Sequence, residues 1–283
     1  MTIKRILIPL IVLTLLASCS TLKLGYNTAD WWLGWYAGRY VDMNGNQKNT
    51  FKSDIDSLLS WHRTTQLPRY AEFFEDLKEA VAEPVAADQL QQAALDGQQM
   101  INDVQHRVIK PAARLLVSLS DKQVEKLLDE LQEQAEKYQE DYVEPNAEER
   151  IEARTERMEK LAKQWIGKPN NYQKERIQRW SAALKNSASM EINHQQDWKK
   201  KLAQALKQRQ YAPQTVNDFL ESYLFRSANS VSEEHRQANI HNQQQTFQLI
   251  ADLINSMTDK QREHLDKRLS RLADDFRELA EEK

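Results

Sequence analysis

Cys19 is the residue with the most distinctive chemistry, because it is the single cysteine among 283 residues. A lone thiol cannot form a disulfide within its own chain, but it can be modified covalently. Lys4 and Arg5 form a short positive region, residues 6–17 are apolar, and small residues precede the cysteine. The apolar run is too short to cross a bilayer as an ordinary helix. This layout is typical of a secretory signal peptide, so we expect residues 1–18 to be removed.

The residues Leu16-Ala17-Ser18-Cys19 resemble the lipobox of bacterial lipoproteins. The resemblance implies that the thiol receives a diacylglycerol, that the chain is cut before Cys19, and that the new amine is acylated. Several acyl chains anchor a protein stably. Removing two of the 39 basic residues leaves 37 against 42 acidic ones, a net charge of −5. Ser20 stands where inner-membrane lipoproteins of enterobacteria carry Asp, so the resemblance implies an outer-membrane protein facing the periplasm. The alternative is an ordinary signal peptide with a chance cysteine.

Groups that form catalytic or metal sites are poorly arranged in this sequence. His194 and Asp197 are the only plausible pair of metal ligands, and two ligands do not close a zinc site. A glycine-rich phosphate loop, a nucleophile elbow and a second thiol are absent. The net charge of −3 gives no electrostatic reason to expect nucleic acid. We therefore expect no metal, no cofactor and no enzymatic activity. A lone catalytic glutamate, as in some wall-cleaving lipoproteins, is the third-ranked interpretation.

Aromatic residues cluster 12 to 21 residues after the cysteine, at Trp31, Trp32, Trp35, Tyr36 and Tyr40. On a helix, Trp32, Tyr36 and Tyr40 lie on one face at intervals of four residues. Tryptophan and tyrosine favour the membrane–water interface, so the cluster is a candidate membrane contact or partner-binding surface. The alternative is that these side chains pack into the core, because aromatic residues contribute most to burial.

A second cluster of basic and aromatic residues surrounds Leu67-Pro68 and consists of Trp61, His62, Arg63, Arg69 and Tyr70. Because proline interrupts helices, we expect the chain to turn a corner here between two helices. An arginine stacked over an aromatic ring would hold this corner. The alternative is a binding site for a ligand or a partner protein.

The elements that carry these residues are predicted to be helical. Only Gly97 and Gly167 follow Gly45, and strand-like alternation is absent. Charged residues make up 29% of the chain, and the mean hydropathy is −0.76. We predict an all-α protein, an elongated antiparallel helical bundle, with helices near residues 29–42, 51–66, 69–82, 87–109, 112–118, 121–143, 147–166, 171–209, 214–227, 231–256 and 259–281.

The mature chain divides into an aromatic-rich segment at 19–50 and two helical units at 51–166 and 167–283. Residues 118–123 and 256–261 have similar sequences at an offset of 138, which suggests two related halves. Each begins a helix with an apolar seam of alternating four- and three-residue spacing, as in bundles. The seams are Val124, Leu128, Leu131, Ala135, Tyr138 and Tyr142, and Leu265, Leu269, Leu272, Phe276 and Leu279.

Three capping boxes are predicted at helix starts. A capping box pairs a small polar residue with a glutamine three positions later, and each cap contributes about 1 kcal/mol. The pairs are Ser120 with Gln123, Asn170 with Gln173, and Thr258 with Gln261. The simplest interpretation is that these residues only begin helices.

Two of these boxes resemble a pattern in periplasmic helical proteins of the Spy and CpxP type. The matching segments are Leu119-Ser120-Asp121-Lys122-Gln123 and Met257-Thr258-Asp259-Lys260-Gln261, with Ser replacing Thr in the first and Met replacing Leu in the second. In that family the pattern opens long helices of a cradle-shaped chaperone or stress sensor. The resemblance implies a cradle-like binding surface, although this chain is about twice as long.

A further resemblance covers more of the chain. Tyr40-Val41-Asp42, Trp61-His62-Arg63, Leu67-Pro68-Arg69-Tyr70-Ala71 and Trp165-Ile166-Gly167, together with the lipobox, are similar to an uncharacterised family of proteobacterial lipoproteins. That family is a domain of unknown function. It implies an envelope location and a helical fold, and it supplies no activity.

These features together predict a non-enzymatic, lipid-anchored periplasmic protein. Its partner would be another envelope protein or an unfolded chain, besides the membrane that holds the lipid. The main alternative is a structural or accessory subunit of one fixed envelope assembly.

Overall fold

The computed structural model describes residues 19–225 and 231–282, and these residues contain helices and no strand. The all-α prediction is therefore confirmed. The expected signal peptide at 1–18 lies outside the described residues, and Cys19 is the first residue of α2. The elements are α2 (Cys19–Asn27), α3 (Ala29–Tyr40), α4 (Gly45–Trp61), η1 (His62–Gln66), α5 (Leu67–Ala80), α6 (Ala87–Val117), α7 (Asp121–Tyr138), η2 (Gln139–Val143), α8 (Ala147–Ile166), α9 (Asn171–Ala183), α10 (Ala188–Gln208), α11 (Gln214–Leu224), α12 (Glu233–Asn255) and α13 (Asp259–Glu281).

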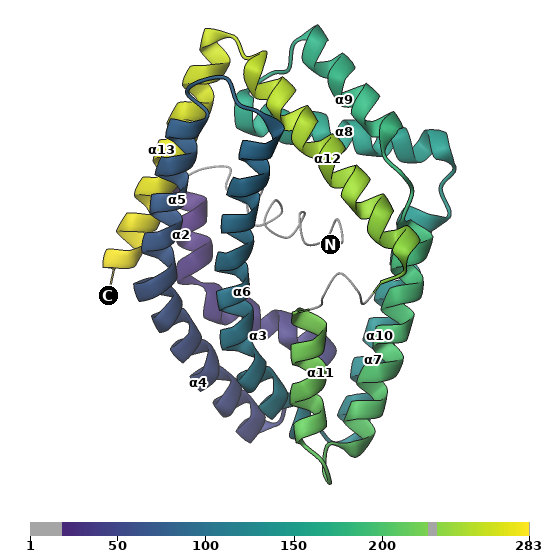
Figure 1. Cartoon of the computed structure of the whole chain (residues 1–283). Helices are drawn as coiled ribbons and strands as arrows, with labels where there is room; N and C mark the ends of the chain where they lie inside the picture. The colour runs from purple at the N-terminus through teal and green to yellow at the C-terminus, as the bar shows by residue number, and fades with distance from the viewer. Residues whose placement is uncertain (1–18, 226–230, 283) are drawn as a thin grey trace.

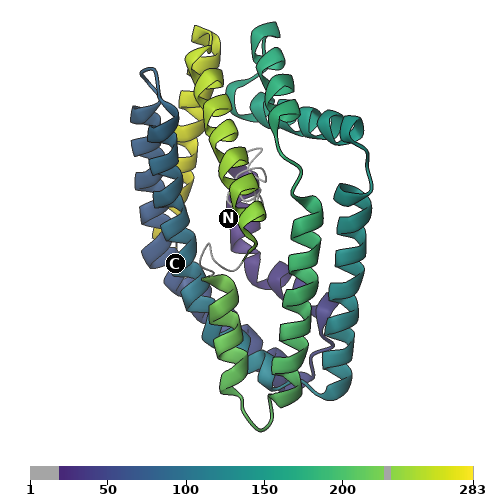
Figure 2. The same ribbon diagram turned by 45° about the vertical axis from the view of Figure 1, so that its right-hand side comes forward.

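The helices are arranged as the sides of an open frame (Figure 1). The helices α5, α6 and α13 form one side, and α7 and α10 form the opposite side. The helices α8, α9 and α12 join these sides across the top of the view. Figure 2 shows the same frame from a second direction, with α7 and α10 running side by side.

Two separate hydrophobic cores hold the frame. The first core lies among α3, α7, α10 and α11 and includes the fully buried Leu119, Leu206 and Val216. The second core lies among α5, α8, α9, α12 and α13 and includes Leu67 and Ile177. Helix α5 packs along α13, whereas α10 packs along α7. Each of the two predicted units therefore packs one of its helices along a helix of the other unit.

The two predicted seams differ in depth. All five members of the seam on α13 are buried, because α5, α8 and α2 all pack against that helix. Of the other seam only Ala135 is buried, while Leu128 and Leu131 of α7 are half-buried and Tyr142 of η2 is exposed. The same sequence period therefore marks a fully covered helix in one core and a partly covered helix in the other.

The predicted corner at Pro68 is wrong, because residues 45–80 form one uninterrupted helical rod. A π-helical turn, η1, lies just before the proline, and the Leu67 amide donates to the His62 carbonyl. The hydroxyl of Thr65 donates to the Trp61 carbonyl at 2.7 Å. The π turn keeps the backbone hydrogen-bonded up to Leu67, and Pro68 then stands in the first turn of α5, where a missing amide hydrogen is tolerated.

Other helix boundaries also differ from the prediction. Helix α4 begins at Gly45 and not at residue 51. Helix α6 continues through Pro111, because Ile109 and Ala113 on either side are buried in tertiary contacts that hold the helix together. The single helix predicted at 171–209 is interrupted at residues 184–187, where Leu184 adopts an extended backbone.

Candidate functional site

The aromatic cluster near the N-terminal end lies on the surface of α3. Trp31, Trp32, Trp35 and Tyr36 are 70%, 43%, 58% and 48% exposed. Only Ala29 of this helix is buried. Leu24 of α2 is also exposed, at 66%, so the apolar surface continues toward Cys19. These four rings therefore do not pack into the core, whereas Tyr40, the fifth member of the predicted cluster, is half-buried against the first core. We refer to Leu24, Trp31, Trp32, Trp35 and Tyr36 as the aromatic surface.

Hydrogen bonds fix α3 relative to α2 and the body of the protein. The Trp32 indole donates to the Gly25 carbonyl at 3.0 Å, and the Thr28 hydroxyl donates to the Leu24 carbonyl at 2.8 Å. Helix α2 is tied to α13 by an ion pair between Lys23 and Asp275 at 3.6 Å. The side-chain amide of Asn27 also donates to Glu282, beyond α13, at 2.8 Å. The aromatic surface is therefore presented at a defined angle.

His62 is the centre of a half-buried polar cluster that joins α2 to the α4–α5 rod. Its Nδ1 lies 3.1 Å from the Tyr26 hydroxyl, and its Nε2 lies 3.2 Å from the Tyr70 hydroxyl. Burial lowers the pKa of the imidazole from 6.5 to about 4 and raises the pKa of both tyrosines to about 12. All three groups are therefore neutral near pH 7, and one tyrosine donates to the ring while the other accepts from it.

The other residues of this predicted site point to different partners. Arg63 stacks over Tyr26 at 4.9 Å and donates to the Leu279 carbonyl at 2.6 Å, so it holds α2 and the end of α13. Arg69 pairs with Asp103 of α6 at 2.6 Å. The Trp61 ring lies against Arg107 of α6, at 5.6 Å. These side chains join helices rather than forming one ligand site, and the cation–π contacts use partners that the sequence analysis did not identify.

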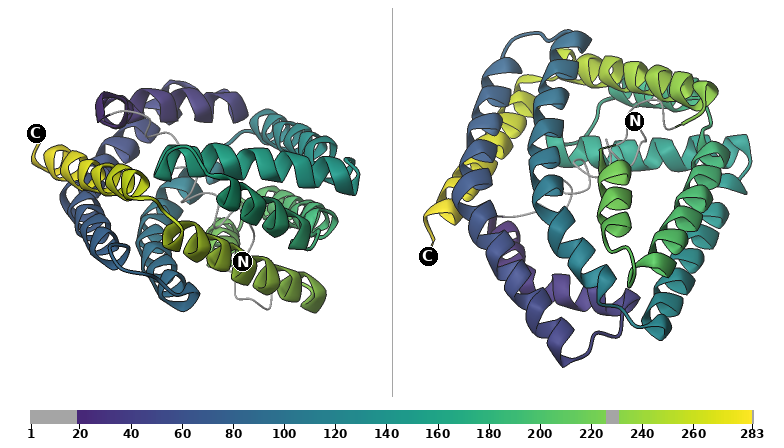
Figure 3. Two further views of the ribbon diagram at one scale, coloured as in Figure 1. Left: turned by 90° about the horizontal axis from the view of Figure 1, so that it is seen from above. Right: turned by 60° about the horizontal axis from the view of Figure 1, so that its bottom comes forward.

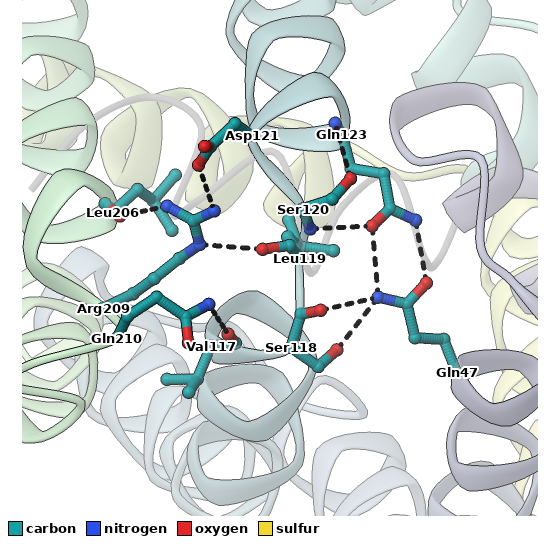
Figure 4. Close-up of polar contacts among 10 residues, drawn as sticks. All are labelled: Gln47, Val117, Ser118, Leu119, Ser120, Asp121, Gln123, Leu206, Arg209 and Gln210. Carbon is teal, nitrogen blue, oxygen red and sulfur yellow. Dashed lines mark hydrogen bonds and ion pairs between the residues drawn. The ribbon is translucent and has the colours of Figure 1, made fainter.

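The predicted capping box at Ser120 and Gln123 is formed, and it meets a fourth box that the sequence analysis missed. This fourth box consists of Asn44 and Gln47 at the start of α4. Figure 4 shows Gln47 and Gln123 joined by two reciprocal hydrogen bonds between their side-chain amides, with N–O distances of 3.2 and 2.7 Å. The Gln47 amide also donates to the Ser118 carbonyl at 2.9 Å. The α3–α4 and α6–α7 corners are locked together in this way.

The same arrangement recurs at the other end of the molecule. The boxes at Asn170–Gln173 and Thr258–Gln261 are both formed, at the starts of α9 and α13. The side-chain amides of their two glutamines form reciprocal hydrogen bonds, with N–O distances of 3.1 and 2.9 Å. The Gln261 amide donates to the Lys168 carbonyl at 3.0 Å, just as Gln123 donates to the Asp42 carbonyl at 2.7 Å. Four of the capping boxes among the described residues thus form two equivalent pairs, and a further box, Asn146–Glu149, begins α8.

A buried arginine supports the α6–α7 corner from the side opposite Gln47 (Figure 4). Arg209 is 5% exposed and donates to the carbonyls of Leu119 at 2.8 Å and Leu206 at 2.7 Å. It also pairs with Asp121 at 2.6 Å. Nothing local in the sequence distinguishes Arg209 from the other basic residues, because Leu119 and Asp121 lie 90 and 88 positions away in the chain.

A buried acid–base pair joins α10 to α12. The Glu191 carboxylate lies 3.9 Å from His235 Nε2, and these residues are 8% and 2% exposed. Burial raises the pKa of the nearby Tyr138 hydroxyl, and the negative charge of Glu191 raises it further. Side chains this enclosed hold helices together more readily than they reach a substrate.

Ligand sites of other kinds are poorly represented in residues 19–225 and 231–282. Three or more histidine, cysteine, aspartate or glutamate side chains do not come together there as a metal site. None of the helices described is both long and apolar enough to cross a membrane. A surface depression of about 410 Å³ between α2 and α13 is lined mainly by charged side chains, among them Lys23, Asp266 and Arg271.

Comparisons with known proteins found a match only at the level of a family. No curated protein and no solved structure matches the chain. A family model described as a family of unknown function (DUF6279) matches residues 39–236. The matched region extends from the end of α3 to the start of α12 and includes the cluster of basic and aromatic residues at positions 61–70 and the Gln47–Gln123 pair, whereas the aromatic surface precedes it. The chain belongs to this family of unknown function.

Proposed function

We propose that this protein is a non-enzymatic, lipid-anchored protein of the bacterial outer membrane that faces the periplasm and binds another envelope protein or an unfolded chain. The anchor is supported by the lipobox-like Leu16-Ala17-Ser18-Cys19 after a short apolar run. Ser20 after the cysteine supports the outer membrane as the destination.

The long helical faces that tertiary packing leaves open give the strongest support for a binding role. Helix α6 has no buried residue between positions 87 and 108, and α8 has none between 147 and 161. Leu95 of α6 is 47% exposed, and Leu90 and Ile101 are half-buried. Faces that mix apolar and amide side chains can contact partners of varied sequence.

The paired caps explain how such faces stay open. The Gln47–Gln123 pair holds the end of α6 through the Ser118 carbonyl, and α6 also contacts α4, α11 and α12. Its position therefore does not depend on burial of the face that carries Leu95. This rigidity also suits a subunit of one fixed assembly, which is the competing proposal. The two proposals differ in the range of partners.

Crosslinking in cells distinguishes the two. A photoreactive amino acid at Leu95 of α6 should capture partner chains, whereas the same group at Tyr211 should not. Tyr211 is 94% exposed in the loop between α10 and α11 and is a control for exposure alone. Many captured chains, together with suppressed aggregation of unrelated denatured proteins at near-equal molar ratio, would support a chaperone-like role. One dominant partner without aggregation suppression would support the fixed assembly. Capture at Tyr211 equal to that at Leu95 would contradict binding by α6.

A further inference from the structure

We infer that the aromatic surface docks on the lipid–water interface of the same membrane that holds the acylated Cys19. This inference rests on the proposed lipid anchor and adds an orientation to it. The frame would then be held against the membrane by its α2–α3 face, at a fixed angle, instead of moving freely on a lipid tether.

The chemistry of the exposed side chains suits this interface. Trp31 and Trp35 are four residues apart, so their indoles lie next to each other on one face of α3. Each ring has a large apolar area and one N–H group, a combination that is favoured at the level of lipid headgroups. Arg39 lies 5.9 Å from the centre of the Trp35 ring, so its positive charge can reach a phosphate beside the inserted ring.

The distance from the anchor is short enough. Helix α2 has nine residues and starts at Cys19, so it spans about 13 Å. Helix α3 begins after a single intervening residue, Thr28. In the left view of Figure 3, α2 and α3 lie along one outer edge of the molecule. A lipid on Cys19 therefore brings this edge to the membrane.

The geometry of the contact is set before the protein meets the membrane. The bond from Trp32 to the Gly25 carbonyl fixes the angle between α2 and α3, and Lys23 and Asn27 fix α2 on the rest of the protein. Exposed apolar surface is thus available without the cost of ordering a flexible segment.

The charges near the aromatic surface determine how strongly docking should depend on anionic lipids. Asp30 at the start of α3 is an exposed carboxylate that offsets Arg39, and Asp42 beyond its end pairs with Lys126 at 2.6 Å. The surface therefore has no strong excess of positive charge, and docking should depend on insertion of the rings more than on anionic lipid.

Quenching of tryptophan fluorescence tests this inference. The full-length gene product, purified from membranes, would be reconstituted in vesicles of phosphatidylethanolamine and phosphatidylglycerol with brominated acyl chains. Bromine quenches only indoles that reach the acyl region. We expect quenching in the wild type and its loss in the double variant Trp31→Ala/Trp35→Ala. Trp165→Phe, in which a half-buried indole of α8 is replaced, should retain the quenching.

The mass of the N-terminal peptide from the same preparation reports acylation independently. An acylated Cys19 with equal quenching in the wild type and the double variant would overturn the inference while leaving the anchor intact. An unmodified Cys19 would overturn the anchor, and the quenching comparison would still decide whether α3 meets lipid. Self-association that the double variant abolishes, without quenching, would assign the surface to a second copy of the chain and would also overturn the inference.

Discussion

Gln173 and Gln261, 88 residues apart in the chain, exchange both of their side-chain amide hydrogen bonds at the point where α9 and α13 begin. Each glutamine also serves its own helix, because its side-chain oxygen accepts from the cap residue's amide. A local capping box is thereby used as a tertiary contact, and the Gln47–Gln123 pair repeats the arrangement in the other core.

Replacing Gln173 with alanine should destabilise the protein strongly. The side chain is fully buried, and its loss leaves the Asn170 amide and one N–H of the Gln261 side chain without a partner. Unsatisfied buried groups of this kind cost about 2–3 kcal/mol in the free energy of unfolding. Urea denaturation followed by circular dichroism measures the change.

A matched control is Gln92→Ala on the exposed face of α6, which should change stability by less than about 0.5 kcal/mol. The double variant Gln173→Ala/Gln261→Ala should lose less than the sum of the single variants, because both changes remove the same pair. Strict additivity would contradict the reciprocal contact.

The two apolar seams should respond differently to a buried charge. Leu269→Asp places a carboxylate at a position that is 1% exposed, under α5, and should cost about 3–5 kcal/mol or prevent folding. Leu131→Asp lies at a half-buried position on α7 and should cost about 1–2 kcal/mol. Thermal unfolding of both variants measures the difference, and equal effects would show that the two seams are covered alike.

Sequence reasoning identified what is local. The caps Ser120, Asn170 and Thr258 follow from residue types three positions apart, and the seams follow from helical periodicity. The box at Asn44–Gln47 has the same spacing, but Gly45 and Asn46 inside it are poor helix formers, and the helix was predicted to begin later.

Contacts between distant residues could not be predicted in this way. Tyr26, Asp103 and Asp121, which contact His62, Arg69 and Arg209, lie on other helices. Their positions depend on how the two predicted units pack α5 along α13 and α10 along α7. Pro68 and Pro111 were interpreted as breaks because local propensity argues for a break, whereas a π turn and tertiary packing carry the helices through.

His62 should make the folded protein sensitive to mild acid. Its pKa is about 4 when folded and 6.5 when exposed, so the unfolded chain binds the proton first as the pH falls. Its contribution to stability is fully present above pH 6.5 and is lost as the pH falls toward 4. Between pH 7 and pH 4.5 the wild type should lose about 2 kcal/mol on this account.

The variant His62→Gln isolates this contribution, because glutamine can bond to both tyrosines without titrating. Its absolute stability at pH 7 will differ, so the measured quantity is the change in unfolding free energy between the two pH values. That change should be smaller in the variant than in the wild type. His264→Gln, at an exposed position, controls for the loss of a histidine. An unchanged pH dependence in His62→Gln would exclude His62 as the cause.

Replacing Cys19 with alanine tests the proposed anchor directly. Acylation forms a thioether on the Cys19 sulfur, and alanine has no sulfur, so the variant should carry no fatty acid and should keep the residues that precede position 19. Labelling with a radioactive fatty acid and the mobility of the protein in gel electrophoresis measure both effects. Ser18→Ala, which retains the thiol and a small residue before it, is the control for a change beside Cys19. A Cys19→Ala protein that is still shortened and labelled would contradict the proposal.

Membrane fractionation of the wild type tests the sorting inferred from Ser20. Recovery in the outer membrane is expected. Recovery solely in the inner membrane would refute the inferred destination while leaving acylation intact.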